Sequence, residues 1–236
     1  MLVDLTRNII PKEFMRVNVV NNSTDEIGEL IFTFNKEAIL GFATELLLLY
    51  DDINDCKKIN ITTHPLKVDP CSNQAIGFYL TPTSPSFMLK VNSLNSDNED
   101  IFNIKRKSHI FINNVNLNEK YYINTNVDVN YEEMTIESYE LSRRNILDIS
   151  IKNSKGTDIT NKCSAVVLEI NRQGIKDFAT SLLIWCNNID NQTEYLIAKD
   201  DKNEKETYFG ALLTRDSVST KVRSGELGNI YDYDFA

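Results

Sequence analysis

The sequence carries one amphipathic helix pattern twice, and this duplication constrains the fold more than any other feature. Residues 36–53 read KEAILGFATELLLLYDDI, and residues 172–189, at an offset of 136 positions, read RQGIKDFATSLLIWCNNI. In both segments apolar residues recur at spacings of three and four, as in a helix with one buried face. Eight pairs are identical at this offset: Asn35/Asn171, Ile39/Ile175, Phe42/Phe178, Ala43/Ala179, Thr44/Thr180, Leu46/Leu182, Leu47/Leu183 and Ile53/Ile189. The sequence therefore predicts an internal duplication.

Short β-type runs flank both helices in a similar order. Around the first helix they are residues 2–10, 14–20, 28–34, 59–63, 76–80 and 87–91. Around the second helix they are residues 147–151, 165–170, 193–198, 207–214 and 219–222. The pattern predicts an α+β fold made of two tandem repeats. Each repeat is expected to be an antiparallel sheet, in the order β-β-β-α-β-β-β, packed on one long helix and related to the other by a pseudo-two-fold axis.

The first strands are expected to form a meander that leads into the first helix, with Asn35 as the N-cap. Residues 92–139 separate the copies and contain strand-like runs at 108–112 and 121–129. These runs predict an inserted β-hairpin that joins one or both sheets. The predicted division is residues 1–95 as the first α+β repeat, 96–136 as the connecting insertion and 137–236 as the second repeat.

Two smaller features complete the structural expectations. Residues 225–236 are polar and aromatic, and we expect a loose tail, with docking on a partner or on the other repeat as the alternative. Trp185 takes the place of Leu49 in the second helix, so it is expected to pack in the core. Leu48 and Leu49 widen the apolar stripe of the first helix, which predicts that this helix is covered on more than one side.

The charge balance limits the classes of partner. The net charge is -9 and the sequence pI is near 4.8, and the densest basic run, Lys105-Arg106-Lys107, is short. Nucleic-acid binding needs a basic face that neutralises phosphates, so no nucleic-acid partner is expected. Asp4 and Arg7 interrupt the only candidate leader, and no apolar run approaches the roughly 20 residues of a membrane span. We expect a cytoplasmic protein with no membrane partner.

The residues that usually carry chemistry are few and scattered. His64 and His109 are the two histidines, and neither has a counterpart in the other repeat. Cys56, His64 and Cys71 fit no common zinc spacing, so we expect no metal and no cofactor. No nucleotide-binding, zinc-protease or esterase motif is present, which favours a non-enzymatic protein, although a Cys–His pair involving His109 keeps an enzyme as an alternative. The four cysteines, Cys56, Cys71, Cys163 and Cys186, are expected to be free thiols.

The first repeat also resembles a known class of proteins. A strand that ends at a cap residue, a helix with the spacing I-x2-F-A-x2-L-L, an acidic stretch and a later strand pair containing YLTPTSP are similar to small immunity proteins of bacterial polymorphic-toxin and contact-dependent inhibition systems. The resemblance covers residues 28–91 and, more weakly, 165–222. It implies an acidic cytoplasmic protein that binds and neutralises one toxin domain.

The leading hypothesis is therefore a non-enzymatic protein-binding module, an immunity protein that acts as a monomer or homodimer. The alternative is a structural or assembly protein, such as a phage or scaffold component, with a self-complementary interface. Acidic residues are clustered at the end of the first helix and in the loop after residue 92, where a basic toxin, such as a nuclease, is expected to bind. The candidate contacts are Asp51, Asp52, Asp55, Asp97, Glu99 and Asp100.

Overall fold

The computed structural model describes residues 14–52, 59–66, 76–91, 145–189, 193–199, 207 and 209–233, and the backbone of short strands at 3–4, 109–110, 121–123, 127–130 and 135–139. The side chains of residues 14, 51, 52 and 173 are outside this description. The described part is an α+β fold with two α-helices and two five-stranded mixed sheets. The predicted fold class is confirmed at this level.

The predicted helices and most predicted strands are present, but some strands are much shorter than predicted. Residues 2–10, 76–80 and 207–214 were each expected to be one strand, and the described residues of each range include only two strand residues. The first half contains β2 (Phe14–Asn21), β3 (Ile27–Phe34), α1 (Lys36–Asp52), β4 (Ile59–Thr63), β5 (Tyr79–Leu80) and β6 (Ser86–Val91). The second half contains β11 (Ile146–Asn153), β12 (Cys163–Ile170), α2 (Arg172–Asn187), β13 (Glu194–Leu196), β14 (Leu212–Leu213) and β15 (Thr220–Ser224). Short 3-10 helices are η2 (Thr160–Lys162) and η3 (Ile230–Asp232).

Both sheets take strands from both halves of the chain, which differs from the predicted antiparallel sheet for each repeat. One sheet has the order β13-β15-β3-β11-β5, and the other has the order β14-β2-β12-β6-β4. β3 is antiparallel to β11 but parallel to β15, and β12 is antiparallel to β2 but parallel to β6. The predicted meander is wrong, because β2 and β3 lie in different sheets. Alternation with period two reports which face of a strand is buried, but not which strand lies beside it.

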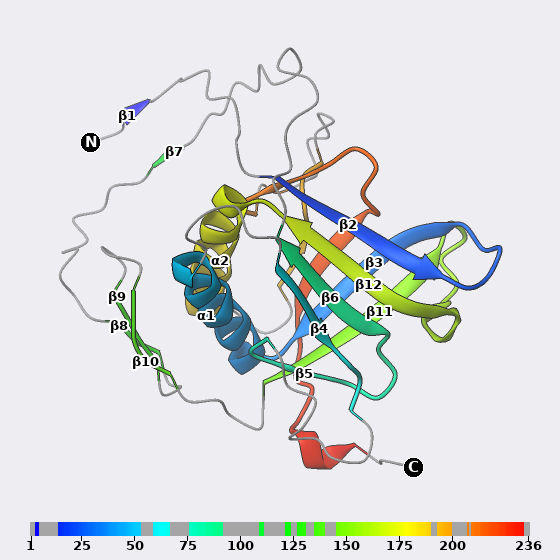
Figure 1. The fold of residues 1–236 in the computed structure, drawn as a ribbon, viewed down its shortest axis with the longest axis horizontal. Helices are drawn as coiled ribbons and strands as arrows, with labels where there is room; N and C mark the ends of the chain where they lie inside the picture. Colours follow the sequence, from blue (N-terminus) through cyan, green and yellow to red (C-terminus); the bar gives the residue numbers. More distant parts are fainter. Residues whose placement is uncertain are drawn as a thin grey trace.

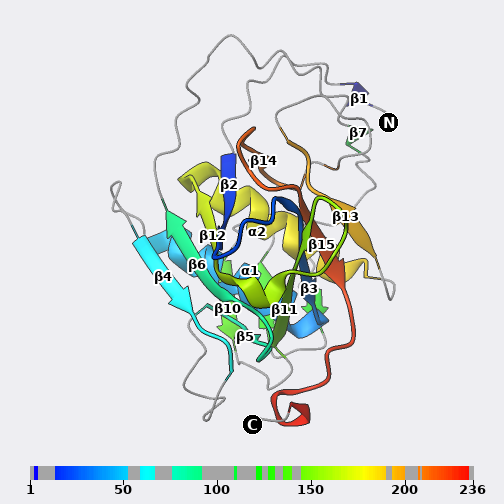
Figure 2. The same cartoon turned by 90° about the vertical axis from the view of Figure 1, so that its right-hand side faces the viewer.

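Single parallel bridges join the two sheets at both sides. Pro65, just after β4, bridges to Leu80 in β5, and Lys199, just after β13, bridges to Leu213 in β14. The strands therefore surround a common core. Figures 1 and 2 show α1 and α2 side by side against one side of these strands.

Aromatic residues from the strands and both helices fill the core. Phe42 of α1 and Phe178 of α2 meet edge to face, with ring centroids 6.1 Å apart. Trp185 is 4% exposed and contacts Phe34 and Phe209 edge to face, which confirms its packing role. A small apolar cavity among these strands has room for about one water-sized sphere. Its lining carries no charged group, so it offers no site for a polar ligand.

The two helices run antiparallel. The Arg172 guanidinium at the start of α2 lies 5.1 Å from the centroid of the Tyr50 ring near the end of α1. At the other end the Cys186 thiol donates to the Lys36 carbonyl oxygen at 3.7 Å. All residues from 38 to 44 of α1 are buried, so this part of the helix is covered on more than one side. The prediction does not hold at Leu48, one of the two residues on which it was based, because Leu48 is 44% exposed.

Asparagine precedes both helices but caps only α2 in the predicted way. The Asn171 side chain accepts a hydrogen bond from the Gly174 N–H at 2.8 Å. The Asn35 side chain instead accepts from the Ile146 N–H at 3.1 Å and donates to the Gly228 carbonyl oxygen at 3.0 Å. Asn35 thus joins the start of α1 to β11 and to the C-terminal segment.

The inserted strands form a sheet of their own instead of joining the two main sheets. β8 (Tyr121–Ile123), β9 (Val127–Asn130) and β10 (Thr135–Tyr139) make a three-stranded antiparallel sheet, and β10 contacts α1. β1 (Val3–Asp4) pairs with β7 (His109–Ile110) and not with β2. The division of the chain at residues 95 and 136 stays a prediction.

Residues 225–233 dock on the fold, so the expected loose tail is wrong for this segment. Ile230 is 0% exposed and clusters with Leu66, Tyr79 and Ile146. The Tyr233 hydroxyl donates to the Leu227 carbonyl oxygen at 2.7 Å. The segment docks within its own chain, because Ile230 packs against residues of both halves, including Tyr79 of β5 and Ile146 of β11.

Candidate partner-binding surfaces

The six predicted contact residues lie at the border of the described residues or outside it. Asp51 and Asp52 form the last positions of α1, but their side chains are not described. The other four candidates are outside the described residues: Asp55, Asp97, Glu99 and Asp100. The structure therefore shows where the segments that carry these residues join the described fold, but it does not show the contacts of their side chains.

The two segments that carry the remaining predicted contacts are attached at neighbouring points. Residues 53–58 lead into Ile59, the first residue of β4. The segment that begins at residue 92 follows Val91, the last residue of β6. Ile59 and Val91 are direct partners in the antiparallel β4–β6 pair. The tertiary structure thus brings together the origins of two segments that are far apart in the sequence.

Basic side chains of α2 lie at the C-terminal end of α1. The Lys176 ammonium lies 5.7 Å from the centroid of the Tyr50 ring, beside the Arg172 guanidinium at 5.1 Å. Cations over an aromatic face are attracted to it, and they also favour the negative end of a helix. These cations are favourably placed at the negative end of α1, and sequence reasoning missed them because they come from the other half.

The acidic excess of the chain lies outside the described side chains. Those side chains include 12 basic and 13 acidic residues, so the described fold is nearly neutral. The whole chain has 25 Lys and Arg against 34 Asp and Glu, which leaves 13 basic and 21 acidic residues for the remainder. All six predicted contacts belong to that remainder.

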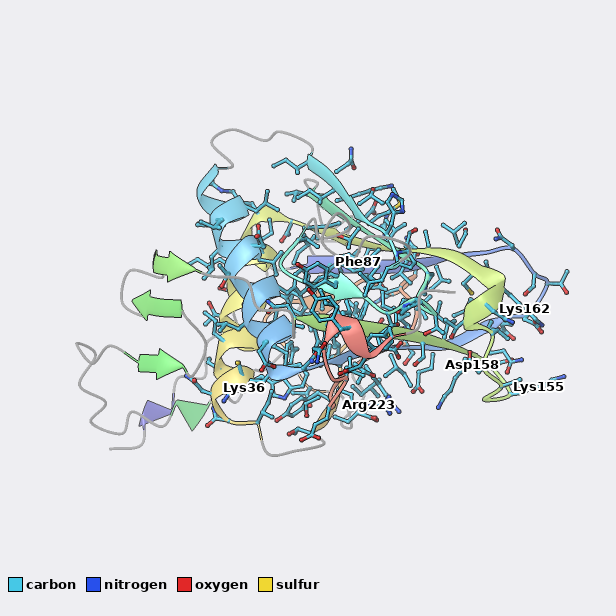
Figure 3. The ribbon with its side chains drawn as sticks, turned by 90° about the horizontal axis from the view of Figure 1, so that it is seen from below. Lys36, Phe87, Lys155, Asp158, Lys162 and Arg223 are labelled. Carbon is cyan, nitrogen blue, oxygen red and sulfur yellow. The ribbon has the colours of Figure 1, made fainter. Side chains whose placement is uncertain are left out.

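A second candidate surface is the two-loop tip, formed by residues 22–26 and 154–162. Figures 1 and 3 place this tip at the end of the molecule opposite to the helices. The Lys162 ammonium contacts the Asp25 carboxylate at 2.8 Å, and backbone hydrogen bonds from Asn22 to Lys162 and from Ser154 to Glu26 join the loops. The two loops therefore form one unit.

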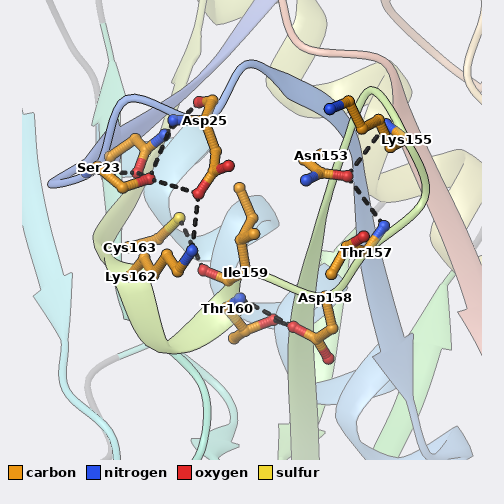
Figure 4. Close-up of polar contacts among 11 residues, drawn as sticks. Ser23, Asp25, Asn153, Lys155, Thr157, Asp158, Ile159, Thr160, Lys162 and Cys163 are labelled. Atoms are coloured by element: carbon orange, nitrogen blue, oxygen red, sulfur yellow. Dashed lines mark hydrogen bonds and ion pairs between the residues drawn. The ribbon is translucent and has the colours of Figure 1, made fainter.

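Side chains fix the first loop of the tip from within (Figure 4). The Asn21 Oδ1 atom accepts from the Ser23 N–H at 2.9 Å, and the Asn21 amide donates to the Asp25 carbonyl oxygen at 2.7 Å. The Lys162 ammonium and the Ser23 hydroxyl hydrogen-bond to the Asp25 carboxylate and lower the pKa of Asp25 below its usual value. Asn, Ser and Asp side chains commonly hydrogen-bond to nearby backbone groups in turns, which is what residues 21–25 do here.

The second loop has the same kind of internal order. The Asn153 Oδ1 atom accepts from the N–H groups of Lys155 and Thr157 at 3.0 and 2.9 Å. The hydroxyl and the backbone N–H of Thr160 both donate to Asp158, and they lower the pKa of its carboxyl group. Loops fixed in this way lose little conformational entropy when a partner binds. The mixture of charges on the tip, however, favours no particular partner.

The described residues with reactive side chains are poorly placed for chemistry. Burial raises the pKa of the Cys186 thiol to about 12 and raises the pKa of Cys163, so both thiols are protonated at neutral pH. Both are free, as predicted, whereas Cys56 and Cys71 lie outside the described residues. His64 is exposed, and its Nδ1 atom lies 3.0 Å from the Ser86 hydroxyl. His109 is described only by its backbone.

The described part of the chain offers neither a cluster of metal ligands nor a membrane-spanning helix. Among the residues with described side chains, no three His, Cys, Asp or Glu residues gather in a way that could hold a metal ion. Neither α1 nor α2, the helices of the described part, has the length and hydropathy of a membrane span. The chain matches no protein-family model, no curated protein and no solved structure in comparisons with each.

Proposed function

We propose that this chain is a non-enzymatic protein-binding module of the cytoplasm, and specifically an immunity protein that binds and neutralises a cognate bacterial toxin domain. The observation that carries the proposal is the division of charge. A nearly neutral fold with 12 basic and 13 acidic side chains holds segments in which acidic residues outnumber basic ones by 21 to 13. Acidic segments on a rigid scaffold suit a basic partner, because complementary charge accelerates encounter and fixes orientation.

We further propose that the chain is a tandem duplication with pseudo-two-fold symmetry. The strand orders of the two sheets support it, because exchanging each first-half strand with its second-half counterpart converts one order into the other. Hydrogen bonds support it as well. The Ser84 hydroxyl accepts from the Ile149 N–H at 2.8 Å, and the Ser217 hydroxyl accepts from the Val17 N–H at 3.1 Å. The two serines lie at matching positions of the two halves, and so do the strands that donate to them.

The proposed contact surface is the acidic one in the first half. Asp51 and Asp52 end α1, and the other four candidates belong to the segments attached at Ile59 and Val91, which are adjacent in the sheet. A basic toxin domain that approaches this region meets the acidic residues of both segments from neighbouring attachment points. In the second copy, residues 187–191 read NNIDN, so the matching helix end carries less negative charge.

The test begins with the product of the neighbouring gene. If the neighbouring gene encodes a toxin, co-expression of this chain is expected to restore the growth of cells that produce the toxin. The two proteins are also expected to co-purify. Failure to bind any neighbouring toxin-like domain contradicts the proposal. Sizing by light scattering separates the alternative of an assembly protein, because a large defined oligomer favours assembly.

Charge variants then test the surface. Asp97→Asn with Asp100→Asn removes two acidic charges from the proposed contact, and Glu26→Gln with Glu226→Gln removes two from exposed positions elsewhere. We expect the first variant to slow association with a basic toxin and to weaken its salt dependence, while the second associates like the unchanged protein. Equal association rates for both variants would reject the acidic surface while leaving the binding function in place.

A further inference from the structure

The two parts of the chain complete each other's sheets. We call residues 14–91 the first segment and residues 145–233 the second segment. Eight strand pairs build the two main sheets, and six of them join one segment to the other. The two pairs within a segment are β4–β6 and β13–β15, and both lie at the side of a sheet. Each segment thus finds its central strand partners in the other.

The helices and the ends of the chain add to this interface. Phe42 of the first segment packs on Phe178 of the second, and Tyr50 packs under Arg172. The Asn35 side chain bonds to Ile146 and Gly228, both in the second segment. The apolar core and the polar contacts are therefore both shared between the segments.

One covalent connection links the two segments, and its span follows from the fold. Val91 is the parallel partner of Ile170, just before α2 starts, whereas Asn145 precedes Ile146, which bonds to Asn35 just before α1 starts. Because the helices are antiparallel, these two starts lie at opposite ends of the helix pair. At 1.5 Å per residue, the rise from residue 36 to residue 50 separates them by roughly 20 Å. The natural connection, residues 92–144, has ample length for this span.

We infer that the partner of each segment need not belong to the same chain, and that a second copy of this protein supplies it when the connection is too short. The same strand pairs and core contacts then form between two chains, as in domain swapping. The choice between the closed monomer and the exchanged dimer depends on the effective concentration of one segment near the other, which the connection sets. The long natural connection favours the monomer.

Two variants that differ only in connection length test this inference. Deleting residues 93–143 leaves Asn92 and Arg144, which reach only about 11 Å between Val91 and Asn145 at full extension. The matched control replaces the same residues with 20 Gly and Ser residues, whose average span is about 25 Å. We expect a dimer of twice the mass from the deletion and a monomer from the control, with the same helix content by circular dichroism. A folded monomer from the deletion, or loss of folding in the deletion alone, overturns the inference.

If both connection variants fail to fold, cleavage of the full-length chain tests whether the two segments associate without a covalent connection. A protease site introduced within residues 96–108 allows the connection to be cut after folding. We expect the two pieces to elute together without denaturant and to reassemble after dilution from urea. Separation of the pieces in native buffer overturns the inference, because it shows that the shared sheets do not hold the segments together.

Discussion

The hydroxyl of Ser84 accepts a hydrogen bond from the backbone N–H of Ile149 at 2.8 Å, and this contact ties the turn before β6 to the central strand β11 of the other half. Ser84 is 4% exposed, and its hydroxyl also lies 2.8 Å from the Thr81 hydroxyl. Ser217 repeats the arrangement with Val17 and Thr214, at 3.1 and 2.9 Å. Two buried serines thus satisfy strand N–H groups that no neighbouring strand reaches.

Replacing either serine is expected to destabilise the fold by a similar amount. Ser84→Ala and Ser217→Ala each leave a buried N–H without its partner, which costs about 1–3 kcal/mol. Urea unfolding followed by circular dichroism measures the change in the free energy of unfolding. Ser154→Ala, at an exposed position of the two-loop tip, serves as the control and is expected to change stability by less than about 0.5 kcal/mol. A neutral Ser84→Ala would show that water reaches the Ile149 N–H.

Two glycines just before β5 and β14 are expected to tolerate no side chain. Gly77 and Gly210 have φ of 79° and 78°, and an added Cβ would lie 2.2 Å from the Gly41 carbonyl oxygen and 2.1 Å from that of Asp177. Left-handed backbone and overlap with a helix backbone together predict a loss of roughly 2–5 kcal/mol for Gly77→Ala or Gly210→Ala.

Gly156 separates the two causes of that loss. Its φ is 81°, but an added Cβ would have no atom within 4 Å. Gly156→Ala is therefore expected to cost only the backbone strain, about 1–2 kcal/mol. Thermal unfolding of the three variants measures the difference. Equal losses at all three positions would mean that the close approach to the helices contributes nothing.

Glu45 is expected to make stability fall as the pH rises from acid to neutral. This carboxyl group on α1 is half-buried, and desolvation raises its pKa above the ordinary value of 4.5. The native state then keeps the proton in a range where the unfolded chain has lost it, so ionisation at higher pH weakens the fold. Glu45→Gln should raise the unfolding temperature at pH 7 and leave it unchanged below pH 4. An equal gain at both pH values would assign the effect to packing instead of charge.

The docked C-terminal segment is expected to contribute to global stability. Ile230 is 0% exposed, so Ile230→Ala should cost about 2–5 kcal/mol through lost burial and the cavity that remains. Glu226→Ala, at an exposed position of the same segment, should cost less than about 0.5 kcal/mol. Guanidinium unfolding of both variants provides the comparison. No effect of Ile230→Ala would mean that the segment detaches without consequence for the rest of the fold.

The candidate site was predicted from the sequence only as a list of residues. The sequence indicated acidic clusters at the end of the first helix and after residue 92, and their side chains remain outside the described structure. Their attachment at the paired residues Ile59 and Val91 was not predictable, because strand pairing joins residues 32 positions apart without any local signal. The two-loop tip was not predicted as a unit, since the ion pair of Asp25 with Lys162 depends on how the two halves meet.

The sequence by itself determined the elements: two helices with matching apolar faces, most of the strands around them, and the buried role of Trp185. These features follow from the spacing of apolar residues along the chain, which depends on the partition of each side chain between water and core. The tertiary structure alone decided that β2 and β3 separate into different sheets and that six strand pairs join the two halves. Alternation fixes the buried face of a strand, but neighbours are chosen by the packing of the whole core, to which both halves contribute.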